Sequence, residues 1–88
     1  MIAHVMQDVS IVFGTRENED AYGRIIKLDR SGNIRWQFPV TSSIDSEPAE
    51  GKNGEVYVAT VDGRIFAVQV RISSTMFQNQ IHNIIILD

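Results

Sequence analysis

Two stretches of the chain resemble each other, and this repetition limits the folds that are open to it. Residues 10–15 (SIVFGT) and 23–29 (GRIIKLD) match residues 55–60 (EVYVAT) and 63–69 (GRIFAVQ). The Gly-Arg-Ile elements are 40 residues apart and the Thr-ended elements 45 apart, so the first copy carries an insertion in its loop, residues 16–22. Each stretch is short, rich in β-branched or aromatic residues, and bounded by turn residues. The repetition therefore indicates two copies of one β unit.

The first copy supplies a full set of predicted strands, and the second copy lacks its last one. We expect strands at residues 2–6, 9–15, 23–29 and 33–38, then at 45–49, 55–60 and 64–70. Asp62-Gly63 and Asn53-Gly54 are typical of two-residue type I′ hairpin turns. In the tail, residues 75–82 are compatible with a short helix. Residues 81–87 either substitute for the missing strand or reach into a neighbouring chain.

The distribution of apolar residues within the strands predicts stacked sheets. Ile34, Trp36 and Phe38 share one face of their strand, and polar residues occupy the other face, as in a half-buried outer strand. Residues 11–13 and 25–26 are apolar on both faces. Strands of that kind are covered on both sides, so the interior strands should lie between layers.

The stretch from Leu28 to Trp36 resembles the repeat of the PQQ-like (quinoprotein alcohol dehydrogenase-like) β-propeller family. That repeat carries an Asp, a Gly and a Trp at the spacing of Asp29, Gly32 and Trp36. In the family the Asp and the Gly shape a hairpin, and the Trp docks between blades. The second copy shares Gly63, Phe66 and Ala67 with the pattern. It then departs, because Gln69 replaces the Asp and no later Trp follows.

The resemblance implies an all-β fold, a partial β-propeller of two antiparallel four-stranded blades, the second of them atypical. Blade one would span residues 2–38 and blade two residues 45–70, with a divergent tail at 71–88. We expect a single domain over residues 1–88. Because one fold hosts many activities, the resemblance by itself predicts the architecture better than the function.

Two blades are too few for a closed propeller, which needs about four to eight. A chain of 88 residues also buries limited surface, and small domains often gain stability by oligomerisation. We therefore expect a homo-oligomer, with three chains giving six blades or four giving eight, or another protein partner. The possible interface is the apolar end of the tail, Ile84, Ile85, Ile86 and Leu87. The alternative is a piece of a longer quinoprotein dehydrogenase-like or sensor propeller, with ligand binding in the full protein.

Composition excludes several other classes of protein. The chain has no cysteine, which excludes disulfides and zinc sites of the cysteine type. A net charge of −3, with Lys and Arg scattered, argues against nucleic-acid binding. No apolar stretch approaches the roughly 20 residues of a membrane helix. The first residues lack the features of a signal peptide, so a cytoplasmic location is the default expectation.

A few residues invite a chemical interpretation, and each has a structural one that we prefer. Asp45 and Glu47 would share a strand face near Glu50, and paired carboxylates can act as acid and base. No partner or pocket marks them. Trp36 could stack on a quinone, but its sequence context favours a core position.

Metal binding is the other chemical interpretation. The acidic loop at residues 17–20 lacks the spacing of a calcium loop. His4 and His82 are too few for a metal cluster. We therefore expect no catalytic residues, no metal and no cofactor, and a non-catalytic interaction or scaffold module that self-associates.

Overall fold

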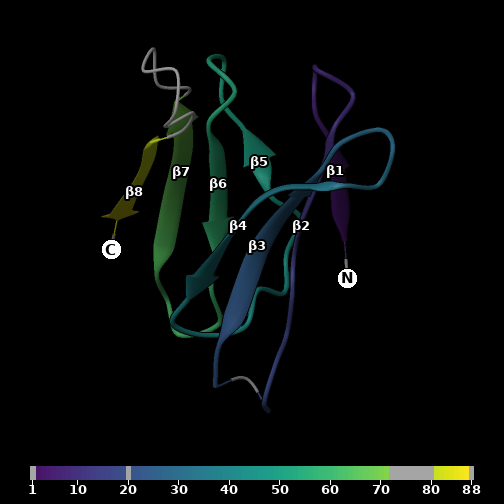
Figure 1. Ribbon diagram of the computed structural model, residues 1–88. Coiled ribbons are helices and arrows are strands. Elements are labelled where there is room, and N and C mark those ends of the chain that lie inside the picture. Colours follow the sequence, from purple (N-terminus) through teal and green to yellow (C-terminus); the bar gives the residue numbers. More distant parts are fainter. Residues whose placement is uncertain (1, 20, 72–80, 88) are drawn as a thin grey trace.

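The chain forms two antiparallel four-stranded sheets (Figure 1), and their strand order follows the sequence. The computed structural model describes residues 2–19, 21–71 and 81–87, with residues 70–71 and 81–87 described by their backbone. The described part contains strands and no helix. Sheet 1 contains β1 (Ala3–Val5), β2 (Ile11–Gly14), β3 (Gly23–Leu28) and β4 (Ile34–Val40). Sheet 2 contains β5 (Ala49–Glu50), β6 (Val56–Ala59), β7 (Ile65–Arg71) and β8 (Ile81–Leu87).

The predicted all-β class is confirmed, and one predicted strand is wrong. Residues 45–49 do not form a strand: Ile44 makes an isolated bridge with Thr60, and pairing resumes only at Ala49 and Glu50. Pro48 lies in this segment and has no backbone N–H to donate to a ladder. Asp45 and Glu47 also lie outside the strand, so they do not share a strand face.

The tail supplies the fourth strand of its own sheet. Strand β8 pairs antiparallel with β7, in continuous register from Arg71 opposite Ile81 to Ile65 opposite Leu87. Of the two alternatives for residues 81–87, the first is therefore the observed one. The suggested helix over residues 75–82 lies mostly outside the described residues, and its last two residues begin β8.

Four of the described hairpin loops share one form, and it is not the predicted two-residue turn. In the loop from Thr60 to Arg64, the Gly63 N–H donates to the Thr60 carbonyl and the Thr60 N–H donates to the Arg64 carbonyl. Gly63 has a φ of 87°, whereas Asp62 is not in the positive-φ region. This is a type I turn followed by a left-handed residue, the usual three-residue hairpin. The same pair of bonds closes the loops 6–10, 29–33 and 51–55.

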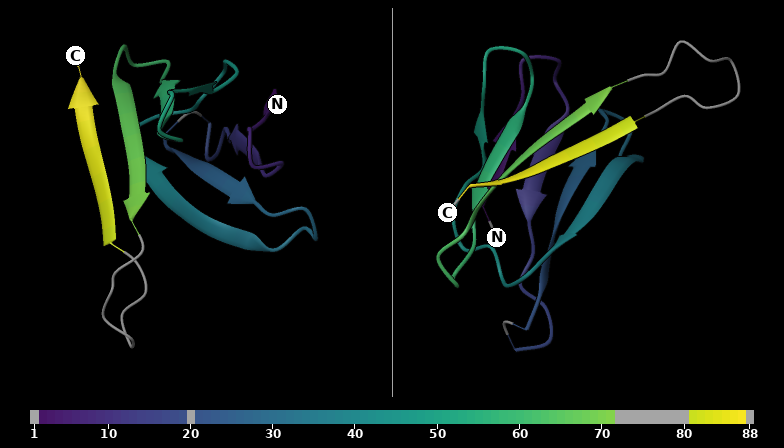
Figure 2. Two further views of the ribbon diagram at one scale, coloured as in Figure 1. Left: turned by 90° about the horizontal axis from the view of Figure 1, so that it is seen from above. Right: turned by 90° about the vertical axis from the view of Figure 1, so that its left-hand side faces the viewer.

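One hydrophobic core joins the two sheets. It contains Val12, Ile25 and Val40 of sheet 1 together with Val56, Val58, Phe66 and Val68 of sheet 2, and Met6 and Ile44 from the connections. Trp36 and Phe38 pack against its rim, with their ring centroids 5.5 Å apart. The N-terminal strand β1 and the C-terminal strand β8 lie on opposite sides of the molecule (Figure 2). The sheets are therefore stacked layers with one shared interior.

The connection between the sheets is tightly packed against sheet 1. The side chain of Ile44 lies against Gly14, where a Cβ would overlap it, and Ile44 is bonded through its N–H to the Thr15 carbonyl. At Gly23 a Cβ would lie 2.6 Å from the Thr15 carbonyl oxygen and 2.8 Å from that of Ser42. Both glycines are therefore needed for close approach of the connection rather than for a turn.

Candidate functional site

The most distinctive surfaces of the molecule arise because each sheet contributes only one of its two faces to the shared core. Successive side chains in a strand point to opposite faces. The inner face of each sheet is the one whose residues enter the shared core, and the outer face is the opposite one. On sheet 1 the inner face carries Val12 and Ile25, both fully buried. On sheet 2 it carries Val56, Val58, Phe66 and Val68, all buried.

The outer face of sheet 1 is apolar over three strands. It carries Val5 on β1, Ile11 and Phe13 on β2, and Ile26 and Leu28 on β3, which form register pairs Val5–Ile11, Ile11–Leu28 and Phe13–Ile26. Val5 is 66% exposed, whereas Ile26 at the centre is buried. On β4 this face carries Gln37 opposite Ile26, with the exposed Ile34 opposite Leu28. The result is an apolar patch that the other sheet does not cover.

The outer face of sheet 2 is also apolar. It carries Ala49 on β5, Tyr57 on β6, and Ile65 and Ala67 on β7, with Ala49 opposite Tyr57 and Tyr57 opposite Ala67. Ile65 is 42% exposed. The Tyr57 hydroxyl donates to Glu55 Oε2 at 3.2 Å, so its polar end is satisfied within the sheet. This second patch lies on the side of the molecule opposite the first.

An ionic cluster joins the inner faces at the β1–β5 end of the stack. His4 Nδ1 lies 3.1 Å from Glu47 Oε2, and His4 Nε2 lies 3.3 Å from Glu50 Oε1. The Glu50 carboxylate also accepts the Gln7 N–H at 3.1 Å. Hydrogen bonding to Glu47 raises the pKa of His4 above its usual value, and Glu50 adds to this effect. A doubly protonated imidazole can donate to both carboxylates, whereas a neutral one can donate to only one.

A second charged contact on the inner face involves Lys27. Its Nζ lies 3.1 Å from Asp8 Oδ2. Hydrogen bonds from the Ser10 hydroxyl and N–H, with the Lys27 ammonium, lower the pKa of Asp8 to about 2. Asp8 thus both shapes the β1–β2 loop and neutralises a cation at the edge of the core.

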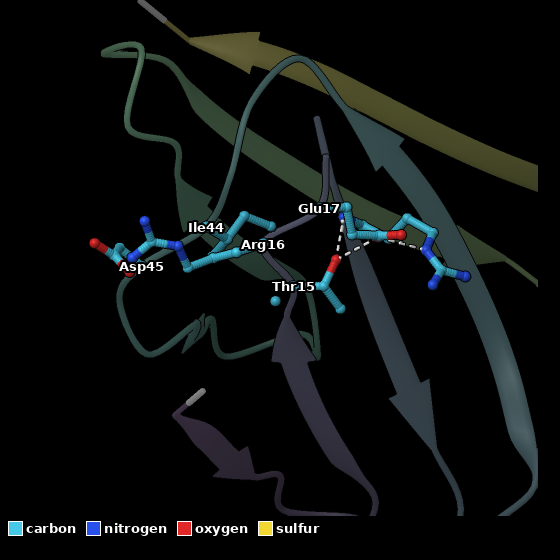
Figure 3. A pocket seen from close by; sticks show the side chains of 7 residues that line it. Thr15, Arg16, Glu17, Ile44 and Asp45 are labelled. Carbon is cyan, nitrogen blue, oxygen red and sulfur yellow. Dashed lines mark hydrogen bonds and ion pairs between the residues drawn. The ribbon is translucent and has the colours of Figure 1, made fainter. Parts of the chain in front are cut away.

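A pocket of about 410 Å³ lies where the β2–β3 loop meets the connection between the sheets. Two ion pairs lie in its lining: Arg16 with Asp45, both labelled in Figure 3, and Arg24 with Glu17. The Arg16 Nη1 to Asp45 Oδ1 distance is 2.8 Å, and the Arg24 Nε to Glu17 Oε2 distance is 2.7 Å. Arg24 and Thr15 donate to the Glu17 carboxylate and lower its pKa. The charges of this pocket therefore compensate one another.

The repeat-motif residues occupy loop and core positions. Asp29 Oδ1 accepts the N–H groups of Ser31 and Asn33, both at 2.9 Å, and Gly32 takes the left-handed position of that loop. Trp36 lies beside the shared core. In the second copy, Phe66 is buried in the core, while Ala67 lies on the outer face and Gly63 in a hairpin loop.

Asp45 and Glu47, the two carboxylates expected to share a strand face, are not brought together. Asp45 faces Arg16 in the pocket lining, while Glu47 and Glu50 face His4 at the other end of the stack. No group of three or more His, Cys, Asp or Glu side chains suited to a metal ion occurs in the part of the chain that the structure describes. Of the acidic loop, Glu17 is held by Arg24, and residue 20 lies outside that part. The side chain of His82 is likewise outside it.

The possible interface residues Ile84, Ile85, Ile86 and Leu87 lie in β8, whose backbone pairs with β7. Their side chains are outside the described residues. The sequence alone does not identify the two outer faces as specific surfaces. A signal for them was present, because residues 11–13 and 25–26 are apolar on both faces, but periodicity does not say which face the partner sheet covers.

Comparison of the chain with protein-family models finds no match, and comparison with curated proteins finds none either. Among the described residues, no helix has the length and apolar character needed to cross a membrane.

Proposed function

We propose that this protein is a non-catalytic interaction module of the β-propeller type, which self-associates to complete its sheet stacking. The observation that carries the proposal is the pair of uncovered apolar outer faces, one on each sheet. Contiguous exposed apolar surface rimmed by polar residues marks interaction sites in soluble proteins. Val5 and Ile65 lie exposed on these two faces, although β7, which carries Ile65, also buries Phe66 and Val68 in the core.

The arrangement of charges supports a role in binding rather than in catalysis. A catalytic acid or base needs a protonation state that is free to change at a reacting group. Here Asp45, Glu17 and Glu47 are each engaged with a cationic or basic side chain. The pocket at the β2–β3 loop is lined by such compensated pairs.

The proposal is tested by measuring molar mass by light scattering over a wide range of protein concentration. Self-association predicts a mass that rises with concentration and reaches a multiple of one chain, with three chains for six sheets or four for eight. Circular dichroism on the same samples checks that the chain is folded. A folded monomer at every concentration would contradict the proposal.

The same outer faces support a second candidate. In it the chain is a piece of a longer PQQ-like propeller, in which further repeats cover both faces and the ligand binds to the full protein. The hairpin built on Asp29 and Gly32, followed by Trp36 at the core, favours this candidate. Titration with the quinone cofactor and calcium discriminates the two, with Trp36 fluorescence as the signal. Saturable quenching supports the second candidate and is not expected of the first.

A further inference from the structure

The two sheets correspond residue by residue, and their strand registers agree. In sheet 1 the register pairs of β2 and β3 are Ile11–Leu28, Val12–Lys27, Phe13–Ile26 and Gly14–Ile25. In sheet 2 the pairs of β6 and β7 are Val56–Val68, Tyr57–Ala67, Val58–Phe66 and Ala59–Ile65. These are the same positions of the sequence repeat, taken in the same order. Each residue of one sheet therefore has a defined counterpart in the other.

This correspondence shows that unlike faces pack together inside the molecule. The inner face of sheet 1 contains Val12 and Ile25, whose counterparts in sheet 2 are Tyr57 and Ile65 on the outer face. The inner face of sheet 2 contains Val58 and Phe66, among others, and the counterparts of its residues form the outer face of sheet 1. The stack is therefore head-to-tail. Each open face is the counterpart of a face that is already buried in the core.

Two basic residues on the inner face of sheet 1, His4 and Lys27, have alanine as their counterparts on the outer face of sheet 2. The register of β1 and β5 makes Ala49 the counterpart of His4 and Val5 the counterpart of Glu50. Ala67 is likewise the counterpart of Lys27. Where the internal stack pairs His4 with Glu50, a repeated stack would place Ala49 opposite Val5. At Val5, Ala49 and Ala67 the open faces are thus more apolar than the pair of faces that the molecule buries.

From these observations we propose that the occupant of each open face is a second copy of this chain, bound head-to-tail. The outer face of sheet 1 in one copy packs on the outer face of sheet 2 in the next, in the geometry of the internal stack. Such a heterologous contact forms a ring when its rotation closes. This inference rests on the proposed self-association and adds the mode of contact to it.

Two charge variants at exposed positions test the mode. Val5→Glu blocks the outer face of sheet 1, and Ile65→Glu blocks that of sheet 2. Head-to-tail stacking predicts that each variant alone has the mass of one chain. An equimolar mixture should contain two-chain particles that grow no further, because only one intact face of each kind remains. Val61→Glu, which adds the same charge to a half-exposed hairpin loop, is the control and should keep the wild-type mass.

The outcomes separate this inference from the proposed function. If wild-type protein assembles but only one of the two variants is monomeric, the contact joins like faces and the head-to-tail mode is overturned. Assembly of both variants as in the wild type, or a monomeric mixture, also overturns the mode while self-association stands. A monomeric wild type removes both proposals. Urea unfolding at high dilution verifies that each variant is folded, and Val5→Lys with Ala49→Lys is the reserve pair.

Discussion

Ile25 and Ile65 occupy the same place in the Gly-Arg-Ile element of the two repeats, yet their surroundings are opposite. Ile25 is 0% exposed between the sheets, whereas Ile65 is 42% exposed on an outer face. Both isoleucines end a Gly-Arg-Ile element, and their register partners, Gly14 and Ala59, are counterparts in the repeat. Neither local sequence nor register therefore explains the difference in exposure. The two positions differ in what packs on them. Sheet 2 covers Ile25, whereas no sheet among the described residues covers the face that carries Ile65. The comparison shows that each sheet is covered on its inner face only. The outer face of sheet 2 carries the same type of residue as the inner face of sheet 1.

The glycines that precede these isoleucines differ as well. Gly23 has an ordinary backbone conformation and is packed against the carbonyl oxygens of Thr15 and Ser42. Gly63 has a φ of 87° and open space around it. The repeated glycine thus has two roles. In sheet 1 it allows the connection between the sheets to pack closely, and in sheet 2 it takes the left-handed position of a hairpin loop. Matched substitutions in the two repeats therefore separate the effects of packing from those of local conformation.

The largest difference is expected between Ile25→Ala and Ile65→Ala. At high dilution, Ile25→Ala should lower the free energy of unfolding by about 2–5 kcal/mol, because it opens a cavity in the shared core. Ile65→Ala should lower it by about 1 kcal/mol or less, because the side chain is already partly in water. Urea denaturation followed by circular dichroism measures both. Equal losses for the two variants would show that the sheets are not stacked on the stated faces.

The two glycines provide the next comparison. Gly23→Ala places a Cβ against two backbone oxygens, and we expect a loss of about 3 kcal/mol, since backbone must shift. Gly63→Ala meets no atom and costs only the strain of a left-handed alanine, about 1 kcal/mol. Thermal unfolding of the two variants, measured side by side, checks which substitution causes the larger loss of stability. A larger loss at Gly63 would contradict the assigned close approach at Gly23.

A smaller effect of opposite sign is expected at Val9. The loop 6–10 places Val9 at a φ of 64°, where the matching loop of sheet 2 has Gly54 at 81°. A β-branched residue is strained in this region. Val9→Gly should therefore raise the free energy of unfolding by about 1 kcal/mol, since the relief of strain exceeds the entropy cost of glycine. Val9→Ala, which keeps a Cβ, serves as the matched control, and a gain as large as that of glycine would argue against strain.

The smallest effect concerns the pH dependence of the His4 cluster. Glu47 and Glu50 raise the pKa of His4, so the folded state holds the proton more tightly than the unfolded state. The resulting stabilisation is fully present below the ordinary histidine pKa and is lost as the pH rises through the raised value. Its size should be about 0.5 kcal/mol, because the cluster is partly in water. The free energies of unfolding of wild type and His4→Gln, compared between about pH 5 and 9, measure it, because this range extends to both sides of the ordinary histidine pKa. A difference that does not shrink as the pH rises would refute the assignment.

Much of the fold could be predicted from sequence, because strands of β-branched residues between glycine-containing turns carry a strong local signal. Strands β2, β3, β6 and β7 lie where expected. No strand forms over residues 45–48, because Pro48 has no backbone N–H to donate to a ladder, and pairing resumes only at Ala49 and Glu50. The turn at Asp62-Gly63 differs in type because one left-handed residue, not two, closes the loop.

The candidate faces were harder to predict. Periodicity showed that residues 11–13 are apolar on both sides, but not that Val12 points into the core while Ile11 and Phe13 point away from it. Repeat alignment alone could not assign inner and outer faces, because the choice depends on how the two sheets stack. The ion pairs that join distant segments, such as His4 with Glu50, gave no signal in the spacing of charges.

Cross-linking of single cysteines tests the head-to-tail contact most directly, because the chain has no native cysteine. Val5→Cys and Ala49→Cys place one thiol each on the outer face of sheet 1 and of sheet 2. A short bismaleimide should join the two variants into a two-chain product when they are mixed. Each variant alone should give no such product. A product from either variant alone, or none from the mixture, would contradict the account.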